Sequence, residues 1–522
     1  MPDNKDADVW TVEDEISKYE EPTSKSSRVT NEDETSEKKT EPPSNKPRSC
    51  LSRLYDAVPS RLIVAIQCFA ASWCSYMLRI NLSLVLLAMV YPSRTEDAEE
   101  VLVPLSEDNV TTSYLEPPLP DYGPRYKWSQ SVQGHLLSAY FYGSVASHIP
   151  GGMLAEVVGA RLVVGVTTLA GAVLTLLCPL AADAGVGWLI AARVLIGICG
   201  GPLYPSLHAL VAQWGPPEEK AKFVWSLLGG TFGTVVTWPI CSAIIEALGW
   251  KASFYILGGV AGVWSILWFV TVYDSPSRHP RIAPHELNYI TTSIAGTVSQ
   301  EKRVLPFWSV ITSCPFLALV GLHFGSLGGL FFLMTEGPKY MSEALGFDIQ
   351  QSGGFASLPY LMRLLFGVVF SSVGDWILSK PNRNKIVVRK LFVIPSHILP
   401  AVLMASMGYI GGNEALAVAI LSLSLGCNGA ATVSNLSNHH DLAPNYAGSL
   451  YGIMNAIGTC TGFIFPAVVG YILEGGNTLE QWRIIFFIGS GLYLVSGLVF
   501  IFFGSAETQP WNFKKKEEAT PS

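Results

Sequence analysis

The chain has 522 residues, of which 14% are charged and 49% hydrophobic, and its formal net charge is −7. Soluble domains carry about 25% charged residues, so this composition excludes an ordinary soluble surface. The charges gather between long apolar stretches, which predicts an all-α polytopic membrane protein that crosses a lipid bilayer.

Residues 1–57 are rich in Glu, Lys, Ser, Thr and Pro and predict a disordered cytoplasmic tail. The tail has no apolar h-region, so we expect the first transmembrane helix to serve as the insertion signal. A second cytoplasmic tail is expected at 505–522.

Twelve apolar runs of about 20 residues predict twelve transmembrane helices. Six fall in 58–273 and six in 307–504, on either side of a basic linker at 274–306, which predicts two six-helix bundles. The runs begin near Leu62, Gln133, Leu162, Val186, Phe223, Ser253, Val310, Gly353, Val388, Leu416, Ser449 and Trp482.

Lys and Arg placement predicts the orientation, because positive residues stay on the cytoplasmic side of short loops. Basic residues precede the first run, fill the linker and 380–390, and follow the last run. Both termini are therefore expected in the cytoplasm. The loop at 92–128 would face outside or a lumen, where Asn109 begins a glycosylation sequon. The sequons at Asn81 and Asn435 lie within apolar runs and are discounted.

Arg79 lies in the apolar run from Leu62 to Met89, which contains no acid. A lone guanidinium at mid-bilayer costs ~2.5–3.5 kcal/mol on insertion scales, so it usually faces a watery cavity and a partner. The expected partner is an anionic substrate; a structural inter-helix pair is the alternative. Ser72, Ser75 and Ser83 share its helical face and predict a polar stripe.

Two short segments place an acid and then a base near predicted helix ends. They are Glu156 and Arg161 after the second run, and Asp375 and Lys380 after the eighth. Such pairs can lock two bundles together and release them during rocking. The alternative is that they anchor helix ends at the membrane surface.

These segments resemble the loop signature of the major facilitator superfamily, and further motifs resemble its anion-transporting branch, which contains sialin, vesicular glutamate transporters and type I phosphate cotransporters. The similarity covers roughly residues 55–513. Its motifs are Arg79-Ile80-Asn81-Leu82, Tyr140-Phe141-Tyr142-Gly143, His148-Ile149-Pro150-Gly151-Gly152, Arg193-Val194-Leu195-Ile196-Gly197, Tyr204-Pro205, Trp214-Gly215-Pro216-Pro217-Glu218, Ser275-Pro276-Ser277-Arg278-His279-Pro280, Asn438-His439-His440-Asp441-Leu442-Ala443-Pro444 and Gln509-Pro510-Trp511.

The resemblance implies a major facilitator fold and assigns anion recognition to Arg79. Arg193 matches an arginine in the family's fourth helix, with Tyr204 near the same face. For Arg193, substrate binding, gating within the protein and snorkelling to the surface all stay open.

Two positions depart from the family pattern. Gly200 stands where sialin-like members carry a glutamate thought to take part in proton coupling, so that mechanism is in doubt here. The remaining candidates for a titrating group lie in or near the predicted spans; they are His148, His208, His323, Glu336 and His439. Each has a hydrogen-bonded helix contact as its alternative. Ser326 replaces an arginine of the glutamate transporters, which disfavours glutamate.

Arg363, within the eighth run, adds a cation to the second half. If it faces the cavity, Arg79 and Arg363 could grip one anion from opposite halves. Pairing with a helix carbonyl or an acid is the alternative.

The sequence thus predicts a secondary active transporter of phosphate or small carboxylates, coupled to sodium, protons or membrane potential. A chloride channel and a non-transporting sensor are the alternatives. No GxxxxGK[ST] loop or plausible GxSxG elbow is present, and the nine cysteines form no CxxC pair, so we expect no enzyme, metal or cofactor. A nucleic acid partner is not expected, and function as a monomer is. The predicted location is the plasma membrane or an intracellular vesicle.

Overall fold

The computed structural model describes residues 58–91, 120–215, 226, 228–295, 305–381, 383–410 and 412–513. These residues belong to one compact unit, Tyr55–Ser522. Within them the secondary structure is helical, apart from one isolated bridge between Val90 and Tyr126. The predicted tail at 1–57, Asn109 and the last residues of the chain lie outside the described residues.

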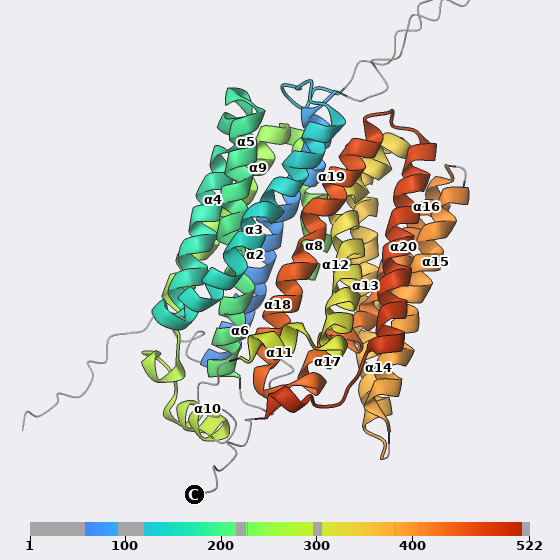
Figure 1. The fold of residues 1–522 in the computed structure, drawn as a ribbon. Coiled ribbons are helices and arrows are strands. Elements are labelled where there is room, and N and C mark those ends of the chain that lie inside the picture. The colour runs from blue at the N-terminus through green and yellow to red at the C-terminus, as the bar shows by residue number, and fades with distance from the viewer. Residues whose placement is uncertain are drawn as a thin grey trace, which may run out of the picture. The chain divides into compact units, whose positions relative to one another are not determined.

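The first half holds six membrane-spanning segments, the fourth of them made of two helices (Figure 1). They are α2 (Ser60–Met89), α3 (Gln130–Val158), α4 (Ala160–Ala184), α5 (Val186–Gly200) with α6 (Leu203–Trp214), α8 (Gly229–Leu248) and α9 (Trp250–Thr271).

The second half holds six more spans, three of which are interrupted by π or 3₁₀ turns or divided into two helices. They are α12 (Cys314–Lys339) with η4 (Tyr340–Ala344); α13 (Ile349–Leu378); α14 (Lys385–Val393) with η5 (Ile394–Ile398), α15 (Leu399–Ser406) and η6 (Met407–Tyr409); α16 (Glu414–Asn428) with η7 (Gly429–Thr432) and α17 (Asn435–Leu442); α18 (Ala447–Thr459) with α19 (Thr461–Leu473); and α20 (Leu479–Phe503).

Short helices complete the described chain. They are η3 (Pro276–Arg278), α10 (Pro284–Ala295), α11 (Phe307–Ile311), η8 (Pro444–Tyr446) and η9 (Pro510–Asn512). In the described part, 11 spans are long and apolar enough to cross a membrane, and α3, with 29 residues, is the twelfth. The predicted fold class is confirmed.

Local sequence explains where the spans begin and break. Asp348 starts α13 with a capping box in which it accepts from the backbone of Gln351 at 2.7 Å. Gly159, with φ +100°, allows the tight turn from α3 to α4. Pro202, whose nitrogen has no proton to donate, lies in the break between α5 and α6 and directly precedes α6.

The two ends of the helical bundles take their names from Gln130 and Glu286. The Gln130 end is where the chain passes from α2 to α3, and the Glu286 end is where α10 lies. At the Gln130 end the halves pack directly, α3 on α19 and α8 on α13. A Cβ built on Gly353 would lie 2.8 Å from Ser242 Oγ, so glycine permits this close approach.

At the Glu286 end, the linker helix α10 is fastened to the first half. The Glu286 carboxylate is 4% exposed and accepts from the backbone nitrogens of Ser60 and Arg61, each at 3.0 Å. It thereby caps the N-terminus of α2, where negative charge is favoured. The Arg61 guanidinium also lies 5.1 Å from the ring centroid of Tyr289 in α10. The linker therefore bonds to the helix that carries Arg79.

Candidate functional site: a cationic centre between the halves

Arg79 lies within α2, surrounded by aromatic rings from both halves. Its guanidinium carbon is 4.3 Å from the centroid of Phe141 and 4.4 Å from that of Phe331, which belongs to α12. Tyr140 and Tyr76 lie at 5.1 and 5.3 Å. These four rings are called the aromatic cage of Arg79. Cation–π contacts stabilise the charge without satisfying its hydrogen-bond donors.

The Nε and Nη2 atoms of Arg79 are buried and have no hydrogen-bond partner. None of the ion pairs among the described residues includes Arg79. Buried donors of a cation are costly unless they are paired, so this arrangement favours binding of an anion.

Arg363, on α13 of the second half, is half-buried and also takes part in none of those ion pairs. Its Nε donates to Asn428 Oδ1 at 3.3 Å, and the Asn428 amide in turn donates to the Ser396 carbonyl at 3.0 Å. A polar scaffold on neighbouring helices therefore orients Arg363 and leaves its charge without a described acid.

Tyr360 connects the surroundings of the two arginines. Its hydroxyl donates to the Leu330 carbonyl at 2.6 Å, and the ring packs edge-on against Trp238 at 5.4 Å. Leu330 directly precedes Phe331 of the aromatic cage, so Tyr360 joins α13, which carries Arg363, to the surroundings of Arg79.

Arg193 is 2% exposed and binds the backbone of α2 beside Arg79. Its guanidinium donates to the carbonyls of Leu78 at 3.0 Å and Arg79 at 2.6 Å, and to Asn81 Oδ1 at 3.3 Å. The side chain does not snorkel to the surface; it joins α5 to α2. A part for Arg193 in substrate binding stays a prediction.

Tyr204, the other predicted binding residue of the first half, lies behind the aromatic cage. Its ring is perpendicular to that of Tyr76 at 6.4 Å, and the two hydroxyls hydrogen bond. Tyr204 therefore orients one ring of the cage.

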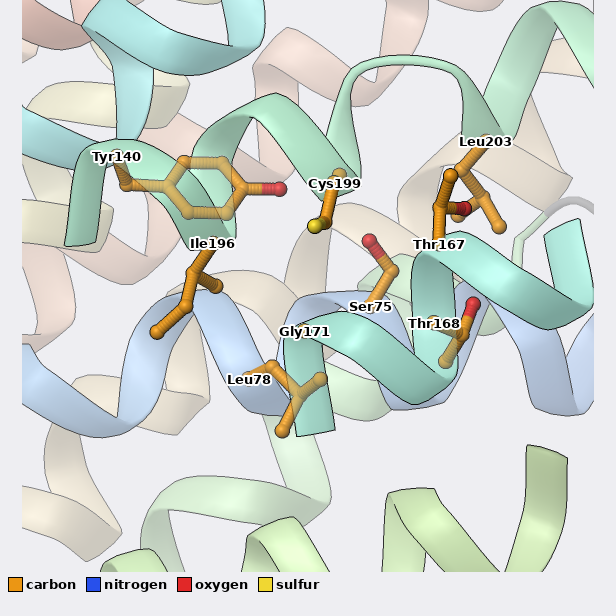
Figure 2. A pocket seen from close by; sticks show the side chains of 10 residues that line it. Ser75, Leu78, Tyr140, Thr167, Thr168, Gly171, Ile196, Cys199 and Leu203 are labelled. Carbon is orange, nitrogen blue, oxygen red and sulfur yellow. The ribbon is translucent and has the colours of Figure 1, made fainter. Parts of the chain in front are cut away.

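Gly200 lines a small cavity in the first half together with Ser75, Tyr140 and Cys199 (Figure 2). The cavity has a volume of about 20 Å³, roughly room for one water. A Cβ on Gly200 would collide with the Tyr140 hydroxyl, which hydrogen bonds to Ser75. Tyr140 thus occupies the space that a longer side chain at position 200 would need.

Two predicted histidines join the halves on the Glu286 side of Arg79. His148 Nε2 lies 3.4 Å from Asn455 Nδ2, and its Nδ1 lies 2.5 Å from the Ser144 carbonyl. The ring of His208 packs on that of Tyr451 at 5.7 Å. Both contacts connect the first half to α18.

Tyr451 is also the neighbour of two further predicted histidines. His323 lies 6.1 Å from its ring and bonds to Asn435 at 2.8 Å, while His439 lies 5.5 Å from it and 4.1 Å from His440. The sequence marked these histidines singly; their convergence on one tyrosine could not be read from it. No spacing signal indicated Tyr451.

The loop pairs lie within their own halves. Arg161 donates to the Phe269 carbonyl, and its backbone nitrogen donates to Asp274 at 2.8 Å; the backbone of Glu156 is in α3. The Lys380 Nζ atom lies 3.6 Å from the ring centroid of Trp376. Trp376 directly follows Asp375, which is exposed. A lock between the halves by these residues stays a prediction.

The second half contains a buried ion pair that the sequence analysis missed. Arg389 binds Asp441 at 2.8 Å, and both side chains are 9% exposed. Asp441 belongs to a motif noted above, but its partner comes from another helix, so sequence spacing could not identify it.

The sequence matches the Major Facilitator Superfamily over residues 65–466. It is 34% identical to human sialin over 453 residues (87% of this chain, 90% of sialin) and 33% identical to a putative inorganic phosphate cotransporter of Drosophila melanogaster over 473 residues (89% and 88%). Identity to human vesicular glutamate transporter 2 is 28% over 459 residues (87% and 75%).

Solved structures with the same fold include a bacterial homolog of the human lysosomal transporter Spinster, with a TM-score of 0.58, 13% identity and coverage of 87% and 100% of the two chains. A D-xylose-proton symporter has a TM-score of 0.57, 13% identity and coverage of 87% and 99%. At these identities the likeness concerns the fold alone. The chain belongs to the major facilitator superfamily, in its anion/cation symporter family, and is a multi-pass membrane transporter rather than an enzyme.

Proposed function

We propose that this protein is a secondary active transporter of phosphate or small carboxylates, with Arg79 as the main anion-binding residue. The observation that carries the proposal is the pair of buried Arg79 nitrogens without a partner, in a transmembrane helix where no described acid pairs with the charge. An anion between Arg79 and Arg363 would form charge-assisted hydrogen bonds with both halves.

Such an anion would favour closure of the halves around it, because it binds both only when they approach.

The driving gradient is sodium, protons or membrane potential. Positive residues favour a cytoplasmic Glu286 end, so the Gln130 end would face the outside of the cell or a vesicle lumen. One chain contains both arginines, which supports function as a monomer.

The test is uptake of labelled phosphate, and separately of a panel of organic anions, into proteoliposomes under imposed sodium, proton and voltage gradients. Saturable, gradient-driven uptake is expected, and Arg79→Ala should abolish it while the purified protein stays monodisperse. Arg483→Ala is the matched control, since Arg483 is 45% exposed and its one ion pair among the described residues is with the exposed Glu480. Uptake that survives Arg79→Ala would refute the central role of this residue.

The same assay separates the alternatives. A chloride channel would show large conductance that follows the electrochemical gradient, without saturable counterflow. A sensor would bind an anion without moving it. Direct packing of the halves at the Gln130 end supports a carrier, whose two ends open in turn.

A further inference from the structure

Three charged side chains follow one another on the last turns of α12 and η4, near the Gln130 end. Glu336 is 1% exposed, Lys339 is 3% exposed and Glu343 is half-buried. We call them the α12 charge cluster. None of the ion pairs shorter than 4.0 Å among the described residues includes a member of it. None of the contacts described above for Arg79 and Arg363 involves a residue of this cluster.

Glu343 bonds to both halves of the protein. It accepts from the side-chain amides of Asn477, which precedes α20, and of Gln130, the first residue of α3. Asn477 is held in turn by the Trp482 indole nitrogen at 2.7 Å, and Trp482 packs on Tyr340 at 4.9 Å. Separation of the halves at the Gln130 end therefore breaks the bond between Glu343 and Gln130.

Glu336 has the opposite environment. Its Oε1 is buried and receives no hydrogen bond, although the neighbouring Glu343 receives two. The charged groups that act on Glu336 are Lys339 and Glu343, one cation for two carboxyls. With both carboxyls ionised the cluster would carry a net charge of −1 in a buried place, and one bound proton would neutralise it.

The turn that carries Glu343 has an uncommon backbone conformation. Residues Tyr340–Ala344 form a π-helix directly after Pro338 and Lys339. Short π segments are uncommon and occur frequently at functional sites. Here the π-helix ends the span at the point where the second half bonds to the first.

We propose that the α12 charge cluster is a proton-operated latch of the Gln130 end. Glu336 takes one proton from the water on that side as the end closes, and Glu343 stays ionised and holds Gln130. When the end opens, water solvates both carboxyls and Glu336 releases its proton to the same side. A lower pH on that side therefore favours the closed state. The proposal rests on the proposed function only in requiring that this end opens and closes.

The experiment measures opening directly, through a cysteine placed at Ser242. This residue is 1% exposed and packs against Gly353 at the closed interface. A membrane-impermeant thiol reagent applied from the Gln130 side labels Ser242→Cys only when that end opens. Native Cys314, though exposed, is at the opposite end of α12, and the parent protein gives the background.

In the Ser242→Cys parent, the labelling rate should fall as pH falls, by up to about tenfold per pH unit for one proton. Glu336→Gln, in which the side chain at position 336 cannot titrate, should label slowly at every pH and lose the pH dependence. Glu336→Asp should keep the dependence, and Glu343→Gln should label faster because the latch loses its charge. Glu480→Gln, 79% exposed at the same end, is the matched control and should behave as the parent.

A Glu336→Gln protein that keeps the parental pH dependence would overturn the proposal, as would loss of that dependence in Glu480→Gln. The assay needs no substrate, so it is independent of anion transport. Arg79→Ala should therefore keep the pH dependence of labelling although uptake is lost. If Arg79→Ala transports normally and Glu336→Gln still flattens the profile, the latch stands and the proposed anion site does not.

Discussion

Arg79 and Arg193 were both predicted to bind substrate, but they have different contacts in the structure. Both terminal nitrogens of Arg193 donate to the α2 backbone and only its Nε has no partner, whereas Nε and Nη2 of Arg79 both have none. A guanidinium whose terminal nitrogens are both bonded within the protein indicates a structural contribution, and an unbonded terminal nitrogen indicates a place for a ligand.

Arg193→Gln should therefore destabilise the protein. The carbonyls of Leu78 and Arg79 would lose their charged donor in a buried place, at about 1–3 kcal/mol for each group left unsatisfied. Thermal unfolding of purified protein in detergent should show a lower Tm than for Arg79→Ala. An unchanged Tm together with lost anion binding would instead assign Arg193 to the substrate.

At the scale of elements, the docking of α10 on α2 should depend on pH. Burial lowers the pKa of His279 below its ordinary 6.5, with Arg281 acting in the same direction and Glu286 opposing. The undocked histidine takes up a proton more readily, so docking is favoured above pH 6.5 and weakens as pH falls through the lower docked value. Hydrogen exchange of α10, measured relative to the intrinsic amide exchange rate at each pH, should quicken as pH falls from about 7 to about 5.

His279→Gln should remove most of this pH dependence, and Glu286→Gln should quicken exchange at all pH values because the α2 N-terminus loses its charged cap. Exchange of α20, which α10 does not contact strongly, is the internal reference. A pH-independent α10 in the parent protein would contradict the prediction.

Apolar length explains how much of these elements could be predicted from the sequence. Twelve spans were recognisable because a bilayer requires about 20 apolar residues per helix, and Arg79 was recognisable because its run holds no acid. The breaks in the spans that start at Lys385 and Glu414 were not predicted, because packing against neighbours decides them. Other contacts join segments far apart in the chain, so sequence spacing could not predict them. They are the ion pair of Asp441 with Arg389, the bonds of Glu286 to α2 and the packing of histidines around Tyr451.

At the scale of the whole molecule, closure of the Gln130 end depends on glycines where the halves touch. A Cβ on Gly353 would lie 2.8 Å from Ser242 Oγ and 3.0 Å from the Trp238 carbonyl, whereas one on the adjacent Gly354 would have nothing within 4 Å. Gly353→Val should therefore hold the halves apart and reduce the rate of uptake by roughly tenfold or more. A tenfold reduction corresponds to about 1.4 kcal/mol of free energy. Gly354→Val is the matched control and should transport normally; equal loss in both would contradict this account.

The aromatic cage has a consequence for the protein without substrate. Phe331 of the second half lies 4.4 Å from the Arg79 guanidinium of the first half, so a ring from the opposite half lies against the residue that we propose binds the anion. Under the proposed function, an incoming anion would exchange its hydration shell for Arg79 and would also displace this phenyl group. Ions that bind Arg79 weakly would not compensate for the free energy of that displacement, so the Phe331 ring would reduce the leak of such ions through the protein without its substrate.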